Sequence, residues 1–579
     1  MALFGDPNLL ISIEMTEGME IIAREPSSAL ISLRKRPEKS RFFKTSIVFI
    51  CLFIATLLLQ YAGDAYTSEL SGYPDEPAHF ITGLMIRDYV AAGFPTSPIA
   101  YAEGYYFYYP KVAFGMWGPL LHVAEAAWTL IFPATRNSVI VLMALISSLT
   151  ATLIFLALSD EVSEALAFLA ALLFVCAPTV QTYTGMIMAD GLVALLDFCA
   201  ALAFGRYLTV GSLKYSCWFG VFACLSVLSK GNGVALVLLP AFAVLFTGRF
   251  SLLKQKSFWV GSAVIACIGG PWQYYSATAL SDIVIRHPGW AFVMFYTKAT
   301  ATMLGVALLP IVLVGVYSRV FASGSPRRLD GKWAAAAALI CSVWAFHSLI
   351  PATSSEYRYL IAVIPPMLMF LMAGVVQIAT WVSLPAFSLS YRTWALGGAV
   401  AALFFATTFT IPKKLHHGFE EVAELLERPA YTHSEILVSS NGCGEGLLIS
   451  EMATREKRPT HVILRASKML AESDWDGERY KEMFHTPNEV LDFLKSIAVG
   501  VVVIDNDPGS QPAPRHHVLL KQAVAAFPGE WEALGSYPQQ SRADIPANIE
   551  VYRLRSTSDS TRPKIRINLP HTLGRSIER

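Results

Sequence analysis

Charged residues are scarce in this sequence. Only 15% of its 579 residues are Asp, Glu, Lys or Arg, 54% are hydrophobic, and the mean hydropathy is +0.46. Soluble globular domains carry about 25% charged residues, so this shortage excludes an ordinary soluble protein and indicates several membrane-spanning segments. The 45 basic and 44 acidic residues leave a net charge of +1, which excludes the basic excess typical of a nucleic-acid-binding protein.

The polar segments contain almost no cysteine. Seven of the eight cysteines lie in apolar runs, and only Cys443 lies in the polar C-terminal part. This distribution excludes a disulfide framework and a cysteine-rich metal cluster. Residues 1–44 lack the short apolar core and small-residue cleavage site of a secretory signal. We expect them to form a cytoplasmic tail ahead of a retained membrane anchor.

Apolar runs that can cross a hydrocarbon layer of about 30 Å dominate the sequence up to residue 411. They predict an α-helical polytopic membrane protein with about eleven transmembrane helices over 45–411. The runs lie near 45–62, 137–158, 163–180, 187–208, 215–229, 231–247, 257–276, 297–317, 333–350, 358–381 and 393–411.

The basic residues predict which side each connection faces. Six of them, from Arg34 to Lys44, precede the first apolar run, and positive charge favours the cytoplasmic side. We therefore expect a cytoplasmic N-terminus, an outer first connection over 63–136, and an extracytoplasmic location for everything after Pro412. The other cations on the inner side are Arg206, Lys214, Arg249, Lys254, Lys256, Arg319, Arg327, Arg328, Lys332 and Arg392.

After the last apolar run, strand-like and helix-like segments alternate. The alternation predicts a small α/β domain over 412–555, and the polar residues 556–579 predict a disordered tail. Gly442-Cys443-Gly444-Glu445-Gly446 resembles a dinucleotide-binding loop only in part, since Leu447 stands where its third glycine belongs. We interpret it as a tight turn, and Asp505-Asn506-Asp507 as acids at a strand end. The strands are expected at 436–439, 461–465, 501–505 and 548–554, with helices near 451 and 488–496.

Two adjacent acids, Asp75 and Glu76, follow the first apolar run. A carboxylate at a membrane boundary is costly unless it is solvated, paired or used, and one that faces a sugar hydroxyl can accept its proton. The alternative is helix capping, because Pro77 suits the first position of a helix. That helix, Pro77–Ala92, has an amphipathic pattern expected to lie in the membrane interface. An aromatic run follows at 105–109.

Taken in order, these motifs resemble the C-type (GT-C) membrane glycosyltransferases, in the family of the protein O-mannosyltransferases and the aminoarabinose transferases of lipid A (glycosyltransferase families 39 and 83). The resemblance covers about 45–410. It implies the GT-C fold and inverting transfer of a sugar from a polyprenyl phosphate to an acceptor hydroxyl on the outer face. It is carried by Asp75-Glu76, the run at 105–120, Ala189-Asp190-Gly191, Ser229-Lys230-Gly231, Pro271-Trp272 and Glu356-Tyr357-Arg358-Tyr359 before Pro365-Pro366.

The resemblance also implies roles for single residues. Asp75 is the expected general base, with Glu76 orienting it or contacting the sugar. Lys111 and Arg358 are the expected ligands of the donor phosphate, where an Arg can bind in bidentate fashion. The alternative for both cations is snorkelling to lipid headgroups, which is our preferred interpretation of Lys230, Arg286 and Lys298.

Three further residues are expected to contact the sugar or the acceptor: Asp190, Tyr109 and His79. For Asp190 the alternative is a helix cap, and for Tyr109 it is an aromatic belt at the headgroup level. His79 and His122 have no metal-ligand spacing, so we assign no metal. A divalent cation stays open, because members of the family differ in using one.

The expected partners are a polyprenyl-phosphate-linked sugar, membrane lipids, and a glycan, lipid or protein acceptor, without nucleic acid. We expect an inner-membrane enzyme. A transporter or flippase for lipid-linked sugars is the alternative, kept open by Asp197 inside the fourth apolar run. A scaffold that only displays the α/β domain is a third possibility.

Overall fold

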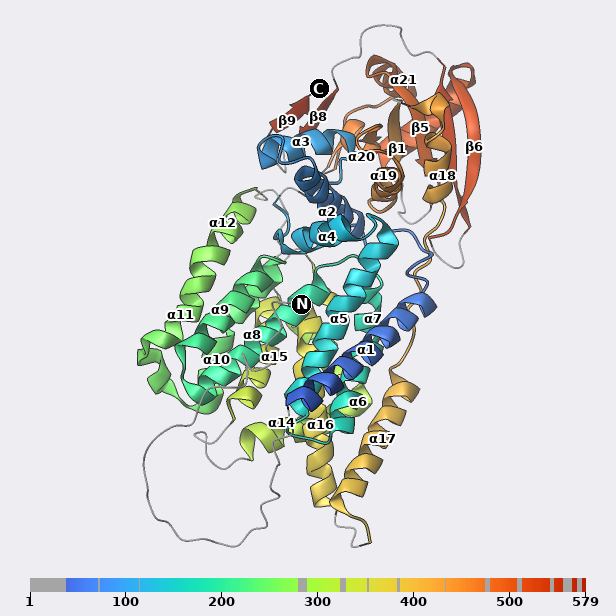
Figure 1. Ribbon diagram of the computed structural model, residues 1–579. Helices are drawn as coiled ribbons and strands as arrows, with labels where there is room; N and C mark the ends of the chain where they lie inside the picture. The colour runs from blue at the N-terminus through green and yellow to red at the C-terminus, as the bar shows by residue number, and fades with distance from the viewer. Residues whose placement is uncertain are drawn as a thin grey trace, which may run out of the picture.

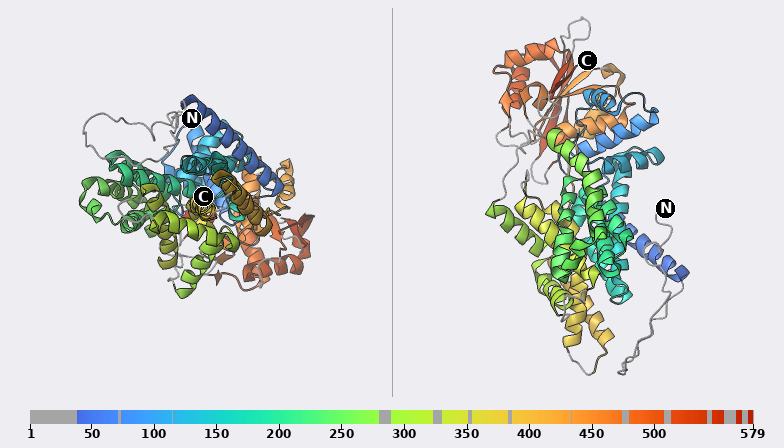
Figure 2. Two further views of the ribbon diagram at one scale, coloured as in Figure 1. Left: turned by 90° about the horizontal axis from the view of Figure 1, so that it is seen from below. Right: turned by 90° about the vertical axis from the view of Figure 1, so that its left-hand side faces the viewer.

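The chain forms a helical bundle followed by an α/β domain, and Figure 1 shows the second part stacked on one end of the first. The right-hand view of Figure 2 shows the same arrangement from the side. The computed structural model describes residues 38–579 apart from 71–72, 114, 280–288, 323–329, 351–353, 383–385, 433, 474–479, 508–512, 542–545, 556–564, 570–574 and 579. Arg286, Arg327 and Arg328 lie outside the described residues.

All eleven predicted apolar runs lie on helical segments. Among the described residues, five segments are long and apolar enough to cross a membrane alone, or seven segments if each of two bent helix pairs counts as one. The count of eleven stays a prediction. The five are α1 (Glu38–Ala62, apolar from Arg41), α5 (Arg136–Leu158), α8 (Asp190–Val210), α15 (Gly331–Leu349), and η9 with α16 (Tyr357–Val363 and Ile364–Trp381).

The bent pairs contain residues that interrupt a helix. α6 (Glu164–Cys176) and α7 (Pro178–Thr184) meet at 59°, because Pro178 cannot donate the next backbone hydrogen bond. α13 (Trp290–Thr302) and the helix from Val306 to Phe321 meet at 74°. The remaining bundle segments are α9 (Leu213–Val227), η3 (Gly231–Val237), α10 (Leu239–Thr247), η4 (Phe250–Lys254), α11 (Lys256–Val264), η5 (Ile265–Gly269), α12 (Gly270–Ala279), η6 (Val306–Leu308), α14 (Leu309–Val316), η7 (Tyr317–Phe321) and α17 (Leu389–Thr407).

Small residues bring bundle helices close together. A Cβ atom at Gly315 of α14 would lie 1.8 Å from the carbonyl oxygen of Phe370 in α16, and one at Gly374 would lie 2.0 Å from that of Ile311. Close backbone approach of this kind is the usual basis of helix association in membranes, where lipid offers no hydrophobic driving force between helices.

The connection between α1 and α5 forms three helices: α2 (Glu76–Ala91), α3 (Pro98–Tyr108) and α4 (Leu120–Ile131). They lie between the bundle and the α/β domain (Figure 1). The expectation that α2 lies in the membrane interface is wrong for its first half. Residues Glu76 to Leu84 are all buried, because α4 and the α/β-domain helix α19 (Gly444–Arg455) both pack on α2.

The α/β domain is built on a five-stranded sheet of order β2-β1-β5-β7-β6. β1 pairs in parallel with β2 and β5, while β7 is antiparallel to both β5 and β6. The central strand β5 is a nearly continuous apolar run, as expected for a strand covered on both faces. The elements are α18 (Phe419–Leu426), η10 (Pro429–Tyr431), β1 (Glu435–Ser439), α19 (Gly444–Arg455), β2 (Val462–Arg465), α20 (Ala466–Met469), β3 (Ala471–Glu472), β4 (Lys481–Glu482), α21 (Pro487–Ser496), β5 (Val499–Asp505), α22 (Arg515–Ala526), η11 (Pro528–Glu530), β6 (Trp531–Gln539) and β7 (Ala547–Leu554).

The predicted disordered tail is wrong in part. β8 (Arg566–Leu569) and β9 (Arg575–Glu578) pair as an antiparallel hairpin. Ile565, Ile567 and Ile577 are buried, because the hairpin packs on α20 and on α3. Alternating apolar residues here supply a strand face that the polar composition of the segment concealed.

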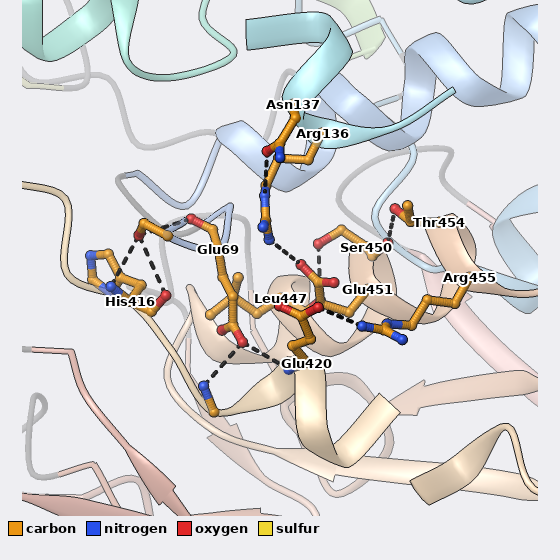
Figure 3. A network of polar contacts seen from close by, with 12 residues as sticks. Glu69, Arg136, Asn137, His416, Glu420, Leu447, Ser450, Glu451, Thr454 and Arg455 are labelled. Atoms are coloured by element: carbon orange, nitrogen blue, oxygen red, sulfur yellow. Dashed lines mark hydrogen bonds and ion pairs between the residues drawn. The ribbon is translucent and has the colours of Figure 1, made fainter. Parts of the chain in front are cut away.

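Largely buried ion pairs fasten the α/β domain to α2 and to the start of α5. Arg136 pairs with Glu451 of α19 at 2.9 Å, and Arg458 pairs with Asp88 of α2 at 2.7 Å. Figure 3 shows the first of these contacts, with Glu69 accepting hydrogen bonds from the backbone of Gly418, at 3.0 Å, and of Glu420, at 2.7 Å. The two parts therefore meet in a specific, hydrogen-bonded interface.

Candidate active site at the junction of the two parts

Asp75 and Arg358, which are 283 residues apart in the chain, form an ion pair at the start of α2. The Arg358 Nη1 atom lies 3.0 Å from Asp75 Oδ2, and the two side chains are 7% and 13% exposed. Asp75 occupies the N-cap position of α2, yet its side chain makes no capping hydrogen bond. Its carboxylate is therefore directed at Arg358 and not at the helix end.

A second ion pair joins Asp190, at the start of α8, to Lys230, which lies between α9 and η3. The ammonium contacts both carboxylate oxygens, at 2.9 and 3.1 Å. The Tyr359 ring connects the two pairs, since Lys230 Nζ lies 5.0 Å and Arg358 Cζ 5.4 Å from its centroid. We call Asp75, Arg358, Asp190 and Lys230 the charge cluster.

Aromatic side chains hold Arg358 in place. The guanidinium carbon lies 4.3 Å from the centroid of the Tyr73 ring, a cation–π distance. The Tyr73 hydroxyl donates to Glu356, and burial together with that bond raises the pKa of Tyr73. Arg358 Nε is buried without a hydrogen-bond partner in the part of the chain that the structure describes. A buried cation with an unused donor is suited to an anionic ligand.

Glu76 does not join the charge cluster. Its fully buried carboxylate contacts Lys414 Nζ at 2.7 Å and accepts a hydrogen bond from the Ile187 backbone at 3.0 Å. Lys414 lies in the linker that leads from α17 to the α/β domain. Glu76 thus points from the start of α2 toward the linker.

Lys111 lies against the glycine-rich loop of the α/β domain. Its ammonium is 3.5 Å from the carbonyl oxygen of Gly442, and a Cβ atom at Gly446 would lie 3.0 Å from Lys111 Cε. Burial, and then the nearby Arg465, lowers the pKa of Lys111 to about 7, while Asp75 is among the groups that oppose the shift. Lys111 is therefore close enough to Asp75 to interact with it electrostatically.

Tyr109 and His79 are buried outside the charge cluster. Tyr109 donates to Glu456 of the α/β domain, so it belongs to the interface between the two parts. The Nδ1 atom of His79 lies 3.0 Å from Nε2 of His122, and its ring packs 4.1 Å from that of Trp117. His79 occupies the interior between α2 and α4.

Part of the sequence matches a known protein family, and the fold resembles solved structures. Residues 118–275 match the family described as dolichyl-phosphate-mannose-protein mannosyltransferase. The fold resembles the apo crystal structure of ArnT from Cupriavidus metallidurans, with a TM-score of 0.53 and 12% identity, over 87% of this chain and 98% of ArnT. The chain therefore has the GT-C fold of ArnT.

Two further structures share this fold. One is ArnT bound to undecaprenyl phosphate, with a TM-score of 0.51 and 12% identity over 88% of this chain and 99% of ArnT. The other is the apo oligosaccharyltransferase of Archaeoglobus fulgidus, with a TM-score of 0.52 and 13% identity over 87% of this chain and 75% of that protein. No curated protein matches the sequence.

The matched family segment contains only half of the charge cluster. Asp190 and Lys230 lie within 118–275, whereas Asp75 and Arg358 lie outside it. The fold brings the two halves together around Tyr359. The Ser229-Lys230-Gly231 motif was the signal for Lys230, but a cation at a span end is also typical of lipid contact, so the sequence alone favoured snorkelling.

The two acids of the charge cluster face basic side chains. Among the described residues, no three His, Cys, Asp or Glu side chains are close enough to hold one. Asp75 and Asp190 instead face Arg358 and Lys230, which supply two positive charges at the same place.

Asp197, the residue that favoured a transporter, has a structural partner. One of its carboxylate oxygens accepts a hydrogen bond from the Ser226 hydroxyl at 2.6 Å. The Ser226 carbonyl in turn accepts from the backbone of Lys230 at 3.0 Å. Asp197 therefore supports the turn that carries Lys230.

Proposed function

We propose that this protein is a GT-C glycosyltransferase, which moves a sugar from a polyprenyl-phosphate donor to an acceptor hydroxyl, with inversion, on the extracytoplasmic face of the inner membrane. The observation that carries the proposal is the charge cluster, in which a carboxylate and two cations meet at the mouth of a helical bundle. A proton acceptor and fixed positive charge are the two things that this transfer needs.

Asp75 is the proposed general base. The acceptor oxygen attacks the anomeric carbon, a new C–O bond forms, and the hydroxyl proton passes to the Asp75 carboxylate. The bond from the anomeric carbon to the phosphate oxygen breaks, and its electron pair leaves with the phosphate. Attack opposite the leaving group inverts the anomeric configuration. The free N-cap geometry of Asp75 supports this role, because the carboxylate is not used by the helix.

Arg358 and Lys230 are the proposed ligands of the departing phosphate. Both are buried cations beside one aromatic ring, and low local dielectric strengthens their attraction for an anion. Lys111 is proposed as a third ligand. Since its pKa is about 7, its positive charge would be stabilised by a bound phosphate dianion. In this arrangement the phosphate displaces Asp75 from Arg358 and releases the base for the acceptor.

Asp190 is proposed to contact a sugar hydroxyl, since its carboxylate lies beside both cations. Tyr109 and His79 are proposed to act at a distance from the sugar. Tyr109 orders the surface below the α/β domain, where an acceptor would approach. His79 supports the interior face of α2.

A small apolar cavity lies next to the charge cluster. It measures about 10 Å³, roughly the space of one water molecule, and is lined by Met143, Phe174, Val180, Tyr183, Met188 and Ile361, among others. Ile361 follows Arg358 by one helical turn, so a lipid chain that widened this cavity would place its phosphate near the cations. An isoprenoid chain has the apolar surface that such a lining favours.

The test uses purified full-length protein, a panel of radiolabelled undecaprenyl-phosphate hexoses and pentoses, and an extract of cell-envelope acceptors. We expect label to reach the acceptors with the natural chain and to fall at least about 10³-fold with Asp75→Asn. Equal transfer by both proteins would refute the base. Movement of labelled lipid between leaflets, without transfer and unchanged in the variant, would instead establish the transporter.

A further inference from the structure

The Glu76–Lys414 pair lies where four segments of the chain meet. Besides Glu76, the Lys414 ammonium contacts the carbonyl oxygen of Gly185 at 3.4 Å, and the Lys414 backbone donates to Gly63 at 2.9 Å. Glu76 also accepts from the Ile187 backbone. The pair therefore joins the end of α1, the start of α2, the turn at 185–187 and the linker to the α/β domain.

Two of these segments carry acids of the charge cluster. Asp75 is the residue before Glu76, and Asp190 follows Ile187 by three residues. The chain immediately on the N-terminal side of each acid is not helical, since α2 begins at Glu76 and α8 begins at Asp190. A fixed contact behind both acids limits how far either carboxylate can move.

We propose that Lys414 is a positioning residue, which holds Glu76 and the 185–187 turn and thereby sets the placement of Asp75 and Asp190. The inference rests on the proposed function, because it assigns Lys414 a part in the same transfer. It also gives the linker a role in catalysis. The α/β domain is attached through the residue that orients the base.

The adjacent Lys413 provides a matched control. It pairs with Asp64 at 2.8 Å, but the two side chains are 52% and 34% exposed, against 6% and 0% for Lys414 and Glu76. An exposed ion pair contributes about 0–1 kcal/mol to the free energy of unfolding. Removing one partner of a buried ion pair strongly destabilises the folded protein. Comparing K413M with K414M therefore separates the effect of losing a lysine from the effect of losing the contact with Glu76.

The experiment compares K413M, K414M and the neutral pair E76Q/K414M in full-length protein. Three quantities are measured: transfer from the labelled undecaprenyl-phosphate sugar that the natural chain uses, the Kd for undecaprenyl phosphate, and the thermal midpoint. We expect K414M to lower kcat about 10²-fold, the scale for a misplaced catalytic group, while KM and Kd stay within about threefold. K413M should transfer within about twofold of the natural chain.

The neutral pair keeps the proposal testable if K414M unfolds. Replacing a buried ion pair by neutral side chains is often neutral for stability, so we expect E76Q/K414M to melt near the natural chain and to transfer as slowly as K414M. Transfer at the natural rate by E76Q/K414M or by K414M would overturn the inference. So would a loss of undecaprenyl phosphate binding in parallel with turnover in the neutral pair. Full transfer by D75N is a different outcome, because it refutes the proposed function.

Discussion

Glu69 makes the junction between the bundle and the α/β domain sensitive to pH. Burial, and next the negative charge of Glu451, raises its pKa from 4.5 to about 8, against the opposing effects of its backbone hydrogen bonds and of Arg136. One carboxylate oxygen accepts both backbone hydrogen bonds, and the other is buried without a partner among the described residues. With a pKa of about 8, the protonated acid is the main form in the folded protein at neutral pH.

The sign and size of the effect follow from these two pKa values. Because the folded protein binds the proton more tightly, the contribution to stability is complete below about pH 4.5 and is lost as the pH rises through about 8. The slope within that window is about 1.4 kcal/mol per pH unit. Between pH 6 and pH 8 the free energy of unfolding should therefore fall by roughly 2 kcal/mol, after allowing for partial ionisation near pH 8.

Substitution E69Q tests this directly, since the amide keeps the acceptor oxygen and cannot ionise. Thermal unfolding in detergent micelles is measured from pH 6 to pH 8. We expect the midpoint of the natural chain to fall about 2 °C further than that of E69Q. Glu451, whose pKa burial also raises, affects both proteins alike, so the difference between them is diagnostic.

A control and a contrary result complete this test. Glu424, an exposed acid of α18, provides the control E424Q, which should follow the natural chain. If E69Q and the natural chain lose stability in parallel from pH 6 to pH 8, Glu69 is ionised in the folded protein, and the reasoning from burial is wrong.

Two further substitutions address the site. K230M should lower the free energy of unfolding by about 3–5 kcal/mol, because it leaves Asp190 buried and unpaired. In a thermal melt, K230M/D190N should regain most of this stability. Similar midpoints for K230M and the natural chain would contradict the buried ion pair. G446A should cost about 1–3 kcal/mol by overpacking, since its Cβ would lie 3.1 Å from Pro77. G442A, with open space around it, should change stability by less than about 0.5 kcal/mol, and equal melts for both glycine variants would show that the loop does not press on α2.

Local patterns predicted the secondary structure well and its environment poorly. The Pro77–Ala92 helix exists as α2, but its polar positions Glu76 and His79 face the protein interior, since α4 and α19 cover them. Amphipathic periodicity reports which residues share a face and not what covers that face. For the same reason, the apolar alternation of Ile565 and Ile567 did not by itself predict a buried strand, because burial depends on the packing partner.

The sequence by itself determined the class of the protein, the position of its helical runs and the order of its motifs, because hydropathy, proline and strand-forming residues act over short stretches of chain. Only the tertiary structure decided that Asp75 meets Arg358, that Lys230 meets Asp190, and that Glu76 turns away to Lys414. The two residues of each pair are between 40 and 338 positions apart in the chain. A buried charge takes whichever opposite charge the packing of the helices brings within reach, and no local pattern records that choice.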